Sequence, residues 1–112
     1  MKSLKLFLET MGPHDESDTY NQMYSQVEPY LGKWGAGEVR GWRRNRGIAF
    51  HVTKGSNVEQ NDWIVVRWNP DYDDYTVMLS EYGEGDEATA KSVKDNVYSN
   101  DLENVIDRML GI

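Results

Sequence analysis

The chain has 112 residues, a net charge of −7 and no cysteine. This length fits a single domain over residues 1–112 that can bury a core without disulfides or metals. The lack of cysteine excludes disulfides, thiolate nucleophiles and zinc sites with cysteine ligands. No stretch approaches the roughly 18 apolar residues of a membrane span, and the N-terminus does not fit a signal peptide, so we expect a cytoplasmic protein that enters no membrane.

The charge is distributed unevenly along the chain. Residues 1–37 carry a net charge of −2, residues 38–68 carry +3 and residues 69–112 carry −8. Because phosphate contacts require clustered cations, a chain with this balance is a poor general binder of nucleic acids. Only the basic middle segment offers the cations for such binding.

Two helices are expected in the first third of the chain. Residues 3–11 show apolar side chains at helical spacing, and we favour a helix there over a short strand. In residues 17–28 a stripe of Tyr, Met and Val recurs at three- and four-residue intervals, which predicts an amphipathic helix facing the core. Pro29 removes a backbone hydrogen bond and disfavours the α conformation at Glu28, so a kink or a new turn should follow before Gly32.

A first pair of strands is expected next. Residues 38–43 and 47–53 have strand character, and the second segment alternates apolar and polar side chains cleanly. Asn45 and Gly47 can adopt the positive φ that a tight reversal between them requires.

The segment around Pro70 predicts the central hairpin, with strands at residues 62–68 and 75–80. Proline cannot donate a hydrogen bond to a sheet, so the first strand should end at about Trp68. The asparagine and aspartates around Pro70 favour a turn. The first strand is apolar on both faces, with Ile64 and Trp63 pointing in opposite directions, which predicts a central position covered on both sides.

The C-terminal third begins with an acidic loop. Residues 88–98 suit either a helical turn or an extended edge segment, and we favour the extended form. Asn100 and Glu103 resemble a capping box before an apolar helical stripe, and Gly111 is a natural end for that helix. The chain is therefore predicted to be an α+β protein, a four-stranded antiparallel meander packed with a helix from the N-terminal half and a C-terminal helix.

No pattern of residues predicts catalysis or metal binding. His14 and His51 lack the spacing of metal-binding motifs, and neither a GxSxG nor an SxxK nucleophile motif occurs. The aspartates of the central turn fail the spacing of a calcium loop. We expect no catalytic residue, no metal and no cofactor; an enzyme built on His51 and nearby carboxylates is the least favoured alternative.

An acidic surface is the first candidate site. It combines the central turn and the acidic loop with the tyrosines beside them: Asp71, Tyr72, Asp73, Asp74, Glu81, Tyr82, Glu84, Asp86 and Glu87. The turn and the loop flank one strand, so they should lie roughly 20 Å apart at about 3.3 Å per residue. Two such clusters can imitate the phosphate track of a nucleic acid, or can serve solubility alone.

A basic hairpin is the alternative site. It contains four arginines and a tryptophan: Arg40, Trp42, Arg43, Arg44 and Arg46. Arginines beside an aromatic ring can hold phosphates and stack a base. They can equally pair with the excess carboxylates of the chain itself.

These surfaces lead to two functional hypotheses. The first is a non-catalytic acidic binding or inhibitor protein that engages a basic protein partner. Its sharpest form is a nucleic-acid mimic, of the phage or mobile-element type, that blocks a DNA-handling or host-defence enzyme. The alternative is a small binder of nucleic acids or nucleotides that uses the basic hairpin.

A homodimer is a further expectation. If both helices pack on one face of the sheet, the other face would leave an apolar aromatic patch that includes Trp63. Such patches mark interfaces, and a symmetric dimer is a common way to close one. The alternative is an aromatic face, including Trp63, that binds another partner.

Overall fold

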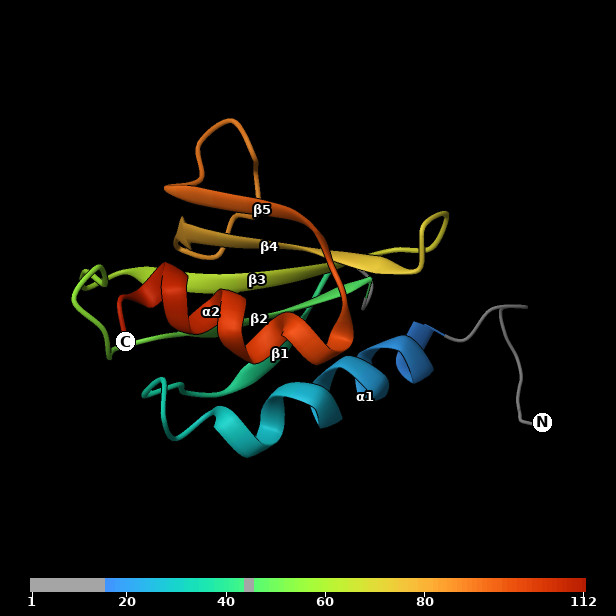
Figure 1. Cartoon of the computed structure of the whole chain (residues 1–112), viewed down its shortest axis with the longest axis horizontal. Helices are drawn as coiled ribbons and strands as arrows, with labels where there is room; N and C mark the ends of the chain where they lie inside the picture. The colour runs from blue at the N-terminus through green and yellow to red at the C-terminus, as the bar shows by residue number, and fades with distance from the viewer. Residues whose placement is uncertain (1–15, 44–45) are drawn as a thin grey trace.

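The computed structural model describes residues 16–43 and 46–112 (Figure 1). The elements follow in the order α1 Glu16–Val27, 3-10 helix η1 Glu28–Tyr30, β1 Val39–Trp42, β2 Gly47–His51, β3 Asp62–Asn69, β4 Asp74–Glu81, β5 Ser92–Val97, 3-10 helix η2 Ser99–Asp101 and α2 Leu102–Leu110. The helix predicted for residues 3–11 lies outside the described residues. None of the helices in the described ranges has the length and apolar character needed to cross a bilayer.

The strands form one antiparallel sheet in the order β1-β2-β3-β4-β5, so each strand pairs with its neighbour in sequence. The meander is confirmed, but the prediction of four strands is wrong, because β5 joins the sheet at the edge beside β4. Its sequence contains only two apolar residues, and all of its residues except Ser92 and Val97 are exposed. Backbone hydrogen bonds to β4 hold this strand in the sheet. Because these bonds do not depend on side-chain type, the sequence of β5 need not alternate between apolar and polar residues.

One face of the sheet packs against both helices. In Figure 1, α2 lies in front of the strands and α1 lies below α2. Alternate residues of β2, β3 and β4 form the core with Met23 and Val27 of α1 and with the buried residues of α2. The prediction that the stripe of α1 faces the core is confirmed. Trp34 stacks on Phe50 with 5.6 Å between ring centroids, and its Nε1 donates a 2.8 Å hydrogen bond to Asp107 of α2.

The opposite face of the sheet is covered by the chain itself, through the loop of residues 82–91. Trp42, Val65 and Met78 are buried on this face. Trp42 Nε1 donates a hydrogen bond to the carbonyl of Glu84, 3.3 Å away, and Gly85 lies so close that a Cβ there would sit 2.5 Å from Trp42 Nε1. The homodimer prediction rests on an open apolar face, which the described part of the chain does not have. The dimer stays a prediction without that support.

The sequence predicts three helix boundaries, and two of them are confirmed. The 3-10 turn at Glu28–Tyr30 follows α1 as Pro29 predicts, and Gly111 ends α2 with φ 79°. The capping box predicted at Asn100 and Glu103 is wrong. The chain enters α2 through η2, so Asn100 lies inside that turn, and no side chain caps η2 or α2 at its start.

Candidate functional site

An irregularity between β4 and β5 creates the site. Tyr75 pairs with Val97 but Val77 pairs with Lys94, so two residues of β5, Asp95 and Asn96, lie opposite Thr76 alone. This is a β-bulge, which bends the strand and redirects side chains. Asn96 has φ 58°, a left-handed conformation that asparagine tolerates better than most residues.

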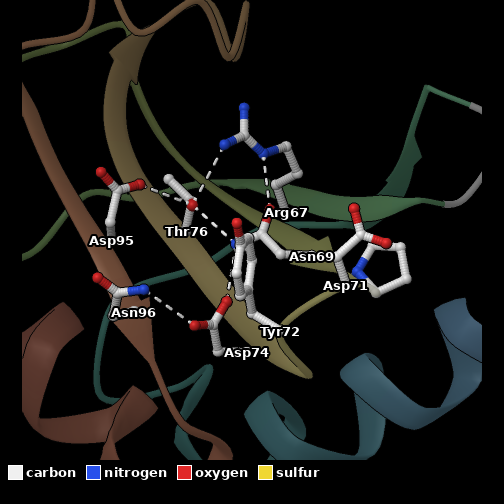
Figure 2. A pocket seen from close by; sticks show the side chains of 9 residues that line it. Arg67, Asn69, Asp71, Tyr72, Asp74, Thr76, Asp95 and Asn96 are labelled. Carbon is white, nitrogen blue, oxygen red and sulfur yellow. Dashed lines mark hydrogen bonds between the residues drawn. The ribbon is translucent and has the colours of Figure 1, made fainter.

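The bulge forms one wall of a pocket of about 430 Å³ beside the β3–β4 turn (Figure 2). The lining is almost entirely polar and comes from β3, the turn, β4 and β5: Arg67, Asn69, Pro70, Asp71, Tyr72, Asp74, Thr76, Asp95 and Asn96. Of these, only Asp71, Tyr72 and Asp74 were predicted as site residues.

Thr76 is the centre of the hydrogen-bond network in the pocket (Figure 2). Its hydroxyl is fully buried and donates a 2.9 Å hydrogen bond to Asp95 Oδ1. The same oxygen accepts hydrogen bonds from Asn69 Nδ2, at 3.0 Å, and from Arg67 Nη2, at 3.2 Å. One buried threonine therefore couples β3, β4 and β5 at the base of the pocket.

Asp74 is buried, with 2 % of its surface exposed. Its two oxygens accept hydrogen bonds from Asn69 Nδ2, at 3.0 Å, and from Asn96 Nδ2, at 3.1 Å. A buried carboxylate requires such partners. The placement of Asp74 on a partner-binding surface is therefore corrected: its carboxylate holds the turn to β5 instead of facing solvent.

Arg67 brings the acidic loop to the pocket. Its Nη2 forms a 3.0 Å ion pair with Glu87 Oε2, while its Nε donates a 3.3 Å hydrogen bond to Asn69 Oδ1. Glu87 therefore does not lie a full strand length from the turn, as the sequence predicted. The loop folds back over the sheet, which brings Glu87 toward the central turn, whereas Glu81 stays at the far end of β4, opposite Asp62.

The rim of the pocket carries exposed residues with polar atoms that have no hydrogen-bond or ion-pair partner among the described residues. Tyr72 is 75 % exposed, and Asp71 and Asp95 are exposed as well. Within residues 16–43 and 46–112, neither Asp71 nor the Tyr72 hydroxyl has a hydrogen-bond or ion-pair partner, and Asp95 uses only Oδ1.

The remaining predicted acids lie on the turn, at the end of β4 and on the loop. Asp73, Glu81, Glu84 and Asp86 are exposed. Tyr82 is 58 % exposed and has φ 60°, a costly conformation for a bulky side chain, and its hydroxyl accepts a 3.2 Å hydrogen bond from Asn61.

The basic hairpin is arranged differently from the prediction. Trp42 is only 8 % exposed, with Arg43 over its ring at 4.6 Å, so this ring does not form an open stacking platform. Arg40 lies 4.2 Å over the ring of Trp63. Arg44 falls outside the described residues, and Arg46 is exposed in the turn just before β2.

His51 is the last residue of β2. Its ring packs against Trp63 at 5.7 Å, and Nε2 lies 2.8 Å from the carbonyl oxygen of Gln60. Among the side chains that the structure describes, no group of three or more His, Cys, Asp or Glu residues is arranged to hold a metal ion.

Several ionisable groups near these features have shifted pKa values. Burial raises the pKa of the Tyr75 hydroxyl, the neighbouring amide of Gln26 lowers it by less, and the charge of Asp73 adds to the rise. A hydrogen bond to Asp62 raises the pKa of Lys91, and one to Asp107 raises the pKa of Lys33.

Sequence reasoning missed Arg67, Asn69, Thr76, Asp95 and Asn96. They come from three strands and meet only because β5 pairs with β4 and bulges opposite Thr76. The single signal in the sequence was the pair Asp95-Asn96, two residues that are rare within strands.

Comparison with known proteins gives no relative: no family description, no curated protein and no solved structure matches this chain.

Proposed function

We propose that this chain is a non-catalytic binding protein that engages a basic protein surface. The observation that carries the proposal is a set of exposed carboxylates to which the described residues offer no cation: Asp71, Asp73, Glu81, Glu84 and Asp86. Two exposed tyrosines, Tyr72 and Tyr82, stand among them. Tyrosine is enriched in protein interfaces, and complementary charge speeds association.

The contrast with other acids of the chain supports a role beyond solubility. Lys33 forms ion pairs with Glu103 and Asp107, and Lys91 with Glu59 and Asp62. Lys33 lies away from the turn and the acidic loop, and Lys91, at the end of that loop, pairs with Glu59 and Asp62 and not with the acids of the loop itself. Of the predicted acidic surface, only Glu87 has an ion-pair partner among residues 16–43 and 46–112.

In its sharpest form the proposal is a nucleic-acid mimic that blocks a DNA-handling or host-defence enzyme. The turn and the loop present carboxylates at separate points of one rigid sheet, as a phosphate backbone presents its charges. A partner that normally binds DNA would then bind either this chain or DNA, but not both at once.

A pull-down from cell lysate tests the proposal, with wild type compared with the double variant Asp71→Lys and Asp73→Lys. Asp74 is left unchanged because it is buried. The double variant Glu28→Lys and Glu38→Lys is the control, since it changes the charge equally at exposed positions elsewhere. Partners should be lost only in the first variant, and duplex DNA should release them. Capture of every partner by both variants would contradict the proposal.

A second candidate function is a small nucleic-acid binder that uses Arg40 and Arg43. Both side chains are exposed and lie on tryptophan rings, and no carboxylate of the described residues pairs with them. A gel-shift experiment with single- and double-stranded oligonucleotides at low salt tests this alternative. It fails if no shift occurs at high micromolar protein.

A further inference from the structure

We propose that the pocket between the β3–β4 turn and the β5 bulge binds the guanidinium group of an arginine side chain from the basic partner. This inference rests on the proposed function and specifies which chemical group of the partner the site takes. A pocket of about 430 Å³ is ample for one arginine side chain and part of the backbone that carries it.

The charge of the pocket selects a cation. Three carboxylates, Asp71, Asp74 and Asp95, line it beside a single cation, Arg67. The charge of Arg67 is already paired with Glu87, which lies outside the lining. Arg67 is already engaged by Asn69, Thr76 and Glu87, so it adds little attraction for an anion. An anionic ligand would meet net repulsion, whereas a cation would be attracted.

The carboxylate oxygens without partners in the described chain suit a guanidinium group, which is planar and carries several hydrogen-bond donors. Asp71 and Asp95 project from opposite sides of the group in Figure 2, one from the turn and one from β5. Asp95 Oδ2 and both oxygens of Asp71 are without partners in the described chain, and each can accept from a guanidinium. Arginine offers five donors in a fixed fork, which a lysine ammonium does not.

Tyr72 supplies the face on which such a group stacks. Its ring lines the pocket and is 75 % exposed, so the ring is accessible to a ligand. Arginine stacks on aromatic rings more often than lysine does. The same contact already occurs twice within the chain, where Arg40 and Arg43 lie over Trp63 and Trp42.

The walls of the pocket are held in place before any ligand arrives. Asp74 and Thr76 are buried, and their hydrogen bonds to Asn69, Asn96 and Asp95 join the three strands that form it. A preorganised site avoids the entropy cost of ordering its side chains on binding.

The test is an NMR titration of the full chain with three peptides, acetyl-Gly-Xaa-Gly-amide, in which Xaa is arginine, citrulline or lysine. Citrulline keeps the shape of arginine without its charge. The arginine peptide should shift the backbone amide signals of Tyr72, Asp95 and Asn96, with an affinity about tenfold or more above that of citrulline. Lysine should bind more weakly than arginine.

Two variants extend the test. Asp95→Asn should weaken binding of the arginine peptide severalfold, because its Oδ1 can still accept from Thr76 while the charge is lost. Asp101→Asn is the matched control, an exposed aspartate outside this pocket, and should leave the affinity unchanged. If Asp95→Asn disturbs the fold, the three peptides on wild type still decide the matter.

Each outcome has a fixed meaning. No shift at millimolar arginine peptide, equal binding of citrulline, or binding of lysine as tight as arginine would overturn the guanidinium site. If partner capture still depends on Asp71 and Asp73 in that case, the proposed function stands without this site. If the arginine peptide binds as described but no partner is captured, the site stands and the proposed function fails.

Discussion

Arg67 of β3 and Glu87 of the loop after β4 form an ion pair, with 3.0 Å between Nη2 and Oε2. They are 20 residues apart in sequence, and their contact ties the acidic loop down over the second face of the sheet. The loop covers Trp42 beneath it, and Glu87 within the loop contacts Arg67, which lines the polar pocket at the central turn. One ion pair therefore links the covering of the core to the candidate site.

The first prediction concerns this ion pair. Glu87→Gln should lower the free energy of unfolding by less than about 1 kcal/mol, because both side chains are partly exposed. Hydrogen exchange of the loop amides should nevertheless become faster, since the loop loses one of its attachments. Glu84→Gln is the control, as that side chain forms no ion pair with described residues. Identical exchange in the two variants would show that Glu87 does not hold the loop.

The second prediction concerns Asp74. Asp74→Ala should lower the free energy of unfolding by about 1–3 kcal/mol, because Asn69 and Asn96 would each keep a donor without its acceptor. Asp71→Ala, at an exposed position of the same turn, should change it by no more than about 0.5 kcal/mol. Urea denaturation of both variants measures the difference. Equal effects would mean that the buried carboxylate contributes nothing particular.

The third prediction concerns the glycine under Trp42. Gly85 has φ 70° and no room for a Cβ, so Gly85→Ala should destabilise the protein by about 1–2 kcal/mol or more. The loop should also move off the ring, which would change the tryptophan fluorescence. Gly32→Ala is the control, because no atom lies within 4 Å of a Cβ there. A neutral Gly85→Ala would contradict the packing of the loop on Trp42.

The fourth prediction concerns alkaline pH. Burial raises the pKa of Tyr75, so above about pH 10 the unfolded chain releases this proton while the folded chain retains it. The free energy of unfolding therefore falls as the pH rises through this range. The raised pKa values of Lys33 and Lys91 act in the same direction.

Tyr75→Phe separates these contributions. Denaturation of wild type and variant at neutral pH and at pH about 11 should show a smaller loss of stability in the variant, which keeps both lysines but lacks the titrating hydroxyl. A loss of the same size in both proteins would show that Tyr75 does not contribute.

The fifth prediction concerns Tyr82, which holds a left-handed backbone conformation with its ring exposed. Tyr82→Gly should not destabilise the protein, because relief of about 1 kcal/mol of backbone strain offsets the lost side chain. Partner capture should fall. Tyr98→Gly is the control: Tyr98 is also exposed, but its backbone is extended, so glycine there should cost about 0.5–1 kcal/mol.

What the sequence alone determined about this protein is local. Pro29 marked the end of α1, Gly111 the end of α2, and Pro70 the turn of the central hairpin, because each restricts its own backbone whatever the rest of the chain does. The apolar pattern of residues 62–68 likewise indicated a central strand covered on both faces. These properties depend on the dihedral angles and the two-residue period of a short segment, which the segment itself specifies.

Only the tertiary structure decided the fifth strand, the β-bulge and the burial of Asp74. Backbone hydrogen bonds attach β5 to β4, and these are the same for any side chains, so the polar sequence Ser92–Val97 carries little sign of them. The sequence predicts a surface position for Asp74 because it lies in a cluster of acidic residues. Asp74 is buried because strand pairing places Asn96, 22 residues later in the chain, beside it, where Asn96 Nδ2 lies 3.1 Å from Asp74 Oδ2. The pocket exists for the same reason, since its walls meet through strand pairing, which no single segment encodes.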